Sequence, residues 1–105
     1  MSPRVTDQIF HIAFATDWED AQRSGAYAQS TVGRTLEEEG FIHCSYADQV
    51  AGVANFAYSD VTDPLVLLTI DPARVGPYIQ VDNGFPHIYG PLDVDAVIEV
   101  RDFHV

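Results

Sequence analysis

The chain contains no lysine and one cysteine, and its positive charges are few. Sixteen acidic residues stand against five basic ones, all of them arginines, which leaves a formal net charge of −11 over 105 residues. The missing lysine excludes Schiff-base chemistry and a P-loop. Because tight nucleic-acid binding needs several cations to neutralise phosphates, this composition disfavours nucleic acid as a partner and favours a small ligand.

Long apolar runs are also missing. No stretch approaches the ~20 apolar residues of a membrane-spanning helix, and "MSPRVTDQIF" at the start lacks the apolar segment of a secretory signal. A single cysteine cannot form an internal disulfide, so we expect an acidic cytoplasmic protein with no membrane partner. The length fits one domain, which we expect over residues 8–105 after a lead-in at 1–7.

Hydrophobic periodicity predicts alternating strands and helices in the first half of the chain. Residues 8–14, "QIFHIAF", alternate as a strand does, with His11 and Ile12 on opposite faces. A helix is expected next, with Thr16 as its N-cap, Glu19 completing a capping box and a glycine ending it at Gly25.

A glycine-rich stretch separates this helix from the next strand. Residues 25–40 predict a loop with one helical turn near its end, and residues 41–45, "FIHCS", predict a short strand. Ser45 is then expected to cap a second helix that runs to Tyr58.

The second half predicts mainly strands. The most apolar run, "LVLLTI" at 65–70, predicts a central strand. Extended segments are expected at 78–81, 85–92 and 96–103, with a tight turn at 82–84. Two early helices and a strand-rich second half predict an α+β fold.

Three of the four histidines share one sequence setting. His11, His43 and His87 each lie inside a short apolar segment, whereas His104 adjoins the end of the chain and is expected to be solvated. Any one of them, taken alone, is better explained as a hydrogen-bonded core or edge residue. Three in the same setting predict a shared cavity.

A metal site is disfavoured by the spacing of these side chains. No two histidines lie within four residues of each other, so no close pair seeds a site. Cys44 adjoins His43, and neighbouring strand residues point to opposite faces. We therefore expect no metal, and Cys44 to be a small core hydrophobe rather than a nucleophile.

The junction after His43 also suggests an anion site. A helix capped at Ser45 would present free N–H groups beside His43, although capping alone explains the serine equally well. Arg23 is a further candidate cation if the fold brings it close. On this hypothesis a phosphate binds near His43 and Ser45, more tightly as pH falls. Tyr89, held with His87 between two prolines, is presented rigidly.

With these residues in view, the chain resembles the family of small bacterial and plant proteins called domain of unknown function 952. The resemblance covers nearly the whole chain and rests on "IFHIAFATDWEDAQRSGAY", "EEGFIHCSYADQVAGVANFAY", "LVLLTIDPARVG" and "FPHIYGPLDVDAVIEV". One departure is the segment between Val75 and Phe85, which is shorter here than in typical members.

That family is classed by fold with the ADP-ribosyltransferase-like proteins. The resemblance implies a small split core of antiparallel or mixed sheet with two main helices. It implies His11, His43 and His87 as catalytic residues, with His11 on the ribose of NAD, His43 near the nicotinamide and His87 at the position of a catalytic glutamate. It also implies a binding site for NAD or a related nucleotide formed by His11, His43, Ser45 and Tyr89.

Two departures leave the activity open. Ile12 follows the first histidine where NAD-using relatives often have glycine, and a histidine replaces the glutamate. The leading hypothesis is a transferase-like or phosphotransferase-like domain that binds or acts on NAD, ADP-ribose or a phosphorylated ribose. The alternatives are a non-catalytic module that binds a nucleotide or small ligand as a sensor, and a purely structural partner protein with no cleft.

Overall fold

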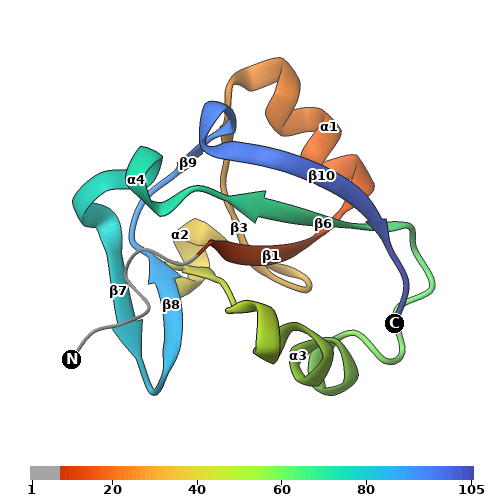
Figure 1. Cartoon of the computed structure of the whole chain (residues 1–105). Coiled ribbons are helices and arrows are strands. Elements are labelled where there is room, and N and C mark those ends of the chain that lie inside the picture. The colour runs from red at the N-terminus through yellow and green to blue at the C-terminus, as the bar shows by residue number, and fades with distance from the viewer. Residues whose placement is uncertain (1–7) are drawn as a thin grey trace.

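Two three-stranded antiparallel sheets organise residues 8–105, the part of the chain that the computed structural model describes (Figure 1). The expected lead-in at 1–7 lies outside the described residues. The first sheet has the order β1 (Ile9–Phe14), β6 (Leu65–Ile70), β10 (Val97–Phe103). The second has the order β5 (Ile42–His43), β8 (Phe85–Ile88), β7 (Ile79–Asp82).

Shorter elements connect these sheets. Two small ladders pair β2 (Ala26–Tyr27) with β9 (Leu92–Asp93), and β3 (Gln29–Thr31) with β4 (Arg34–Thr35). The α-helices are α1 (Ala15–Ser24), α2 (Leu36–Glu39), α3 (Val50–Ala57) and α4 (Pro72–Val75). Single 3₁₀ turns span Ala47–Gln49, Gly76–Tyr78 and Val94–Ala96. The fold is therefore α+β with small antiparallel sheets, and no mixed sheet occurs within residues 8–105.

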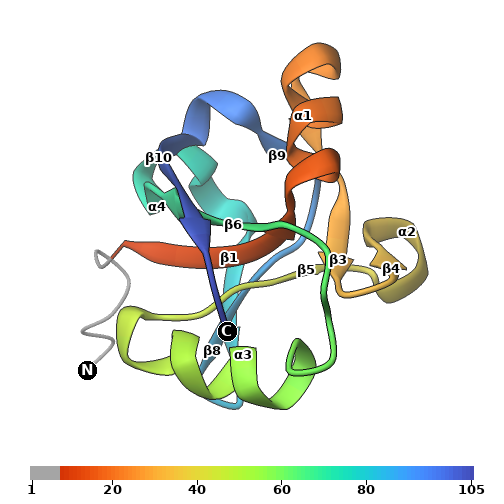
Figure 2. The same cartoon turned by 90° about the vertical axis from the view of Figure 1, so that its right-hand side faces the viewer.

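Helices cover both faces of the first sheet. In both views α1 lies on one side of β1 and β6, and α3 lies on the other (Figures 1 and 2). Trp18 of α1 joins the core that contains Leu68, and Ala54 of α3 joins the core that contains Leu67. All six residues of β6 are consequently buried, which confirms the predicted central strand at 65–70.

The two sheets meet where the end of β5 crosses β1. The Phe10 N–H donates to the Ser45 carbonyl (2.7 Å), and the Ser45 N–H donates to the Phe10 carbonyl (2.8 Å). Ser45 is therefore part of a β-bridge, and its expected role as helix N-cap is wrong. A 3₁₀ turn follows instead, and the Tyr46 N–H is satisfied by the side chain of Gln49 (2.9 Å).

The start of α1 also differs from the expectation. The helix begins at Ala15, whose N–H donates to the Pro64 carbonyl (3.0 Å), so Thr16 lies inside the first turn and is not the N-cap. This contact from the loop before β6 replaces a side-chain cap. The predicted end is confirmed, because Gly25 adopts φ of 94° and its N–H donates to the Ala21 carbonyl.

Residues 25–40 are more regular than the predicted loop. They form β2, β3 and β4, and the expected helical turn is α2, which begins after Thr35. Thr35 and Glu38 form a reciprocal capping box, with N–H to side-chain oxygen distances of 2.8 and 3.2 Å. The strands were missed because each is only two or three residues long.

The predicted turn at 82–84 is confirmed as a two-residue hairpin loop. Asn83 (φ 53°) and Gly84 (φ 82°) both adopt the left-handed conformation that such hairpins require. The register pairs Asp82 with Phe85 and Gln80 with His87. Within residues 8–105, no helix combines the length and apolar character needed to cross a membrane.

Candidate functional site

One face of the second sheet is polar and aromatic, and the other belongs to the core. His43 and His87 are opposite each other in the register of β5 and β8. Their neighbours Ile42 and Ile88 are fully buried on the opposite face. Cys44 also lies in that core, where burial raises the pKa of its thiol, so the side chain is a small hydrophobe as expected.

His87 is held by a carboxylate that the hairpin brings beside it. Its Nδ1–H donates to Asp82 Oδ2 (2.9 Å), and the Tyr89 hydroxyl donates to the same oxygen (2.7 Å). The Gln80 amide donates to Oδ1 of Asp82 (3.0 Å). The hydrogen bond from Tyr89, with those from His87 and Gln80, holds the pKa of Asp82 below its usual value. Asp82 is therefore a carboxylate, and the other ring nitrogen of His87, Nε2, has no hydrogen-bond partner within residues 8–105.

His43 lies beside His87 at the rim. The two rings meet edge to face with centroids 5.2 Å apart, and the His43 side chain is 41% exposed. Its Nε2 lies 4.0 Å from Glu39 Oε1. Burial and the neighbouring His87 lower the pKa of His43, and Glu39 acts in the opposite direction. The imidazole of His43 is therefore uncharged at neutral pH and accessible to a ligand.

His11 has neither ring nitrogen free. Its Nδ1–H donates to the His43 carbonyl (2.5 Å), and its Nε2 accepts from the Tyr27 hydroxyl (2.8 Å). Burial lowers the pKa of His11 to about 4, partly offset by the bond to the His43 carbonyl. His11 is thus neutral at pH 7 and ties β5 to β1, which leaves no nitrogen for the ribose contact that the family resemblance implies.

Phe41 packs these side chains together. Its ring stacks on His87 (centroids 4.1 Å apart, 17° between planes) and meets His43 edge to face (4.7 Å). Phe41 and Asp82 were not among the predicted site residues. Asp82 had a usable signal, because a two-residue hairpin at 83–84 necessarily sets it diagonally across from His87. Phe41 is two residues before His43 and so shares its face.

The three histidines converge on one cavity of about 620 Å³. Ser45 also lines it, whereas Tyr89 is absent from the lining and acts behind Asp82. The remaining lining is mainly apolar and aromatic and includes Phe10, Phe41, Val53, Phe56, Phe85 and Asp82.

Cations are scarce around this cavity. No arginine of residues 8–105 lines it. Arg23 pairs with Asp20 on the exposed surface of α1, and Arg34 pairs with Glu39 near the rim (2.8 Å). A 3₁₀ turn at Ala47–Gln49, and not an α-helix capped by Ser45, follows His43, so the helix start on which the expected anion site depended does not form at Ser45. The side chains that line the cavity are suited to a planar ring and to hydroxyl groups. They do not supply the cations that the diphosphate of NAD would need inside the cavity. Within residues 8–105, no three His, Cys, Asp or Glu side chains cluster around a possible metal position.

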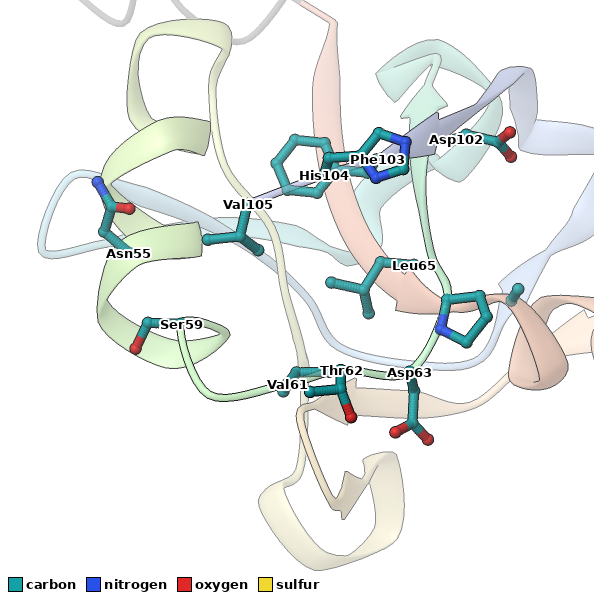
Figure 3. A pocket seen from close by; sticks show the side chains of 12 residues that line it. Asn55, Ser59, Val61, Thr62, Asp63, Leu65, Asp102, Phe103, His104 and Val105 are labelled. Carbon is teal, nitrogen blue, oxygen red and sulfur yellow. The ribbon is translucent and has the colours of Figure 1, made fainter.

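A second cavity, of about 660 Å³, lies between the end of α3, the loop before β6 and the end of β10 (Figure 3). His104 is the one histidine in its lining, alongside Asp63 and Asp102. Among the described residues, these three side chains form no hydrogen bond with one another. The cavity lined by His11, His43 and His87 is therefore the candidate site.

Comparison with known proteins agrees with this fold. The chain is similar to protein CC0527 from Caulobacter crescentus, whose crystal structure superposes with a TM-score of 0.80 at 28% identity, over 93% of this chain and 87% of that one. The solution NMR structure of CC0527 gives a TM-score of 0.74 at 28% identity, over 93% and 85%. No curated protein matches the chain. The model of the family described as "Protein of unknown function (DUF952)" matches residues 12–100, and the chain belongs to that family.

Proposed function

We propose that this chain is a cytoplasmic, ADP-ribosyltransferase-like domain whose histidine cavity binds a nucleotide-like small molecule. The observation that carries the proposal is the convergence of His11, His43 and His87, from three separate sequence motifs, on one cavity. Aromatic side chains supply the remaining surface that a flat heterocycle needs.

The distribution of charge orients the ligand. The ring and sugar enter the cavity beside Phe41, next to His43 and His87, and His43 contacts sugar hydroxyls. Any phosphates remain outside, because no arginine of residues 8–105 lines the cavity and Asp82 repels anions. Arg34 pairs with Glu39, whose other carboxylate oxygen lies 4.0 Å from His43 Nε2. The nucleoside part therefore contributes most of the affinity.

One observation favours the rival function, a binding module without catalysis. Both nitrogens of His11 are used within the protein, and Ile12 adds bulk beside it, so two features of NAD-using relatives are missing. The two functions differ in turnover alone: a sensor binds the ligand and releases it unchanged.

The test is binding of adenosine, AMP, ADP-ribose and NAD, measured by thermal shift and calorimetry. A ligand at ~100 times its Kd stabilises the native state by about 2.7 kcal/mol, which raises Tm by roughly 10–20 °C in a domain of this size. We expect adenosine to bind within about tenfold of AMP, a difference of about 1.4 kcal/mol. His87→Ala should abolish the shift, and His104→Ala, outside the cavity, should retain it. No shift with any of the four ligands contradicts the proposal, and chromatography of the ligands after incubation separates transferase from sensor.

A further inference from the structure

We infer that Asp82 is a positioning residue that makes His87 a general base for water, so that the cavity hydrolyses a bond in its ligand. This inference rests on the proposed function only for the chemical nature of the ligand. The assignment of His87 as the general base is argued from the hydrogen bonds and ring contacts around its side chain.

Three contacts fix the imidazole of His87. Asp82 accepts a hydrogen bond from Nδ1 (2.9 Å), Phe41 covers one ring face at 4.1 Å, and the His43 ring meets it at 5.2 Å. The side chain is 11% exposed, so few alternative rotamers are open to it. A base must have one nitrogen held and the other free, and Nε2 is the free one.

Asp82 is itself held in place. The Tyr89 hydroxyl donates to the same Oδ2 that accepts from His87, and Gln80 donates to Oδ1. These contacts orient the carboxylate toward the ring. As His87 takes up a proton, the adjacent negative charge stabilises the imidazolium without itself being protonated.

The charged and titratable groups around His87 come from four elements. Asp82 is on β7 and Tyr89 follows β8, while His43 lies on β5 and Glu39 on α2 behind it. Asp82 is the one that bonds to the ring. His43 contacts the ring edge through its own imidazole, which forms no hydrogen bond within residues 8–105. His87 differs because Asp82 holds its Nδ1, while its Nε2 has no partner among the same residues.

The reaction class is hydrolysis with water as nucleophile. Nε2 of His87 accepts a proton from water while the water oxygen forms a bond to an electrophilic carbon of the bound ligand. The bond between that carbon and the leaving group breaks, and its electron pair goes to the leaving group. The proton then passes from Nε2 to the leaving group, so one water is consumed and His87 returns to its neutral form.

His11 shows why position decides this role. It is also a neutral imidazole that lines the same cavity, but both nitrogens are used by His43 and Tyr27. A histidine without a free nitrogen cannot accept a proton from water unless one of those bonds breaks.

The experiment uses p-nitrophenyl acetate, whose small aromatic ring suits a cavity lined by phenylalanines. The absence of lysine removes the side-chain amines that usually cause background ester cleavage. We expect the protein to exceed free imidazole at equal concentration by about 100-fold. His87→Gln should lose this advantage, and Asp82→Asn should lose at least about tenfold of it. The exposed His104→Gln, outside the cavity, is the matched control and should keep the full rate.

Three further readouts separate a positioning role from a purely structural one. Asp82→Glu should restore part of the rate that Asp82→Asn loses, because a carboxylate again accepts the hydrogen bond from Nδ1 of His87. Wild type should react more slowly in D₂O, because a water proton moves in the step. Long-range ¹H–¹⁵N spectra should show the neutral His87 ring protonated at Nδ1.

Each outcome decides the inference. A wild-type rate no higher than that of free imidazole, an unchanged rate in folded His87→Gln or Asp82→Asn, or a ring protonated at Nε2 would overturn it. Nucleoside binding without ester hydrolysis overturns this inference and leaves the proposed function standing. Ester hydrolysis without nucleoside binding supports the base and contradicts the proposed ligand.

Discussion

The two three-stranded sheets use histidine in opposite ways. In the first sheet, His11 is buried, neutral and hydrogen-bonded at both nitrogens. In the second, His87 bonds to protein through Nδ1 and leaves Nε2 without a partner among the described residues. Both residues lie in short apolar segments of similar sequence. The difference shows that a histidine in an apolar strand acquires its role from the layers that cover its sheet.

Those layers differ because of the helices. Helix α1 covers one face of the first sheet and α3 covers the other, so a buried polar side chain there has only protein groups as partners (Figures 1 and 2). His11 finds two, whereas the Thr69 hydroxyl of β6 has none within residues 8–105. The second sheet buries Ile42 and Ile88 on one face, while its other face lines the cavity. Polar groups on that open face are able to keep a free nitrogen or oxygen.

The largest expected effect tests whether the first sheet is the structural one. Leu68 is fully buried in β6, and the substitution Leu68→Ala should lower the free energy of unfolding by about 2–5 kcal/mol. Gln80 is exposed on the open face of the second sheet, and Gln80→Ala should lower the free energy of unfolding by no more than about 0.5 kcal/mol. Urea denaturation of both variants measures the difference. Equal losses would break the comparison between the two sheets.

The second prediction concerns the pH dependence that a buried neutral histidine creates. The pKa of His11 is about 4 in the folded protein and 6.5 in the unfolded chain, so the unfolded state binds more protons between these values. The neutral His11 ring therefore contributes fully to the free energy of unfolding above about pH 6.5. This contribution, about 3 kcal/mol in total, is lost as the pH falls toward 4. The lowered pKa of Asp82 adds acid sensitivity, which a His11 variant shares with wild type.

The measurement is therefore a difference between two proteins. Wild type and His11→Gln are unfolded with urea at several pH values from about 7 to 4, and the two slopes are compared. We expect the variant to lose less stability than wild type over this range. Parallel slopes would mean that His11 is able to titrate in the folded state.

The smallest expected effect concerns Gly84, in the turn that joins β7 and β8 of the second sheet. Gly84 has φ of 82°, so alanine there should cost about 1–2 kcal/mol through left-handed strain, although no atom crowds the site. Gly52, inside α3 and equally uncrowded, should gain about 0.4–1 kcal/mol on the same change. Thermal unfolding of the pair isolates the backbone effect. A stabilised Gly84→Ala would show that the hairpin loop, and hence the placement of Asp82, is not constrained as described.

Local preferences explain which elements were predictable. The apolar run at 65–70, the stop at Gly25 and the turn at 82–84 depend on side-chain polarity and glycine conformation, and all three are confirmed. The caps at Thr16 and Ser45 were wrong because backbone contacts with distant segments fix the chain at both places. The Ala15 N–H donates to the Pro64 carbonyl, and Ser45 pairs with Phe10 in a β-bridge.

The sequence by itself determined the α+β composition, the central strand and the three histidines that gather at the cavity, because periodicity and residue type are local properties. The tertiary structure alone decided what each histidine is able to do. Antiparallel pairing brought Asp82 to His87, and packing of β5 and β2 against β1 placed hydrogen-bond partners on both nitrogens of His11. The physical reason is that a hydrogen bond between side chains depends on distances of about 3 Å, and for residues far apart in sequence such distances are set only when the sheets and helices pack.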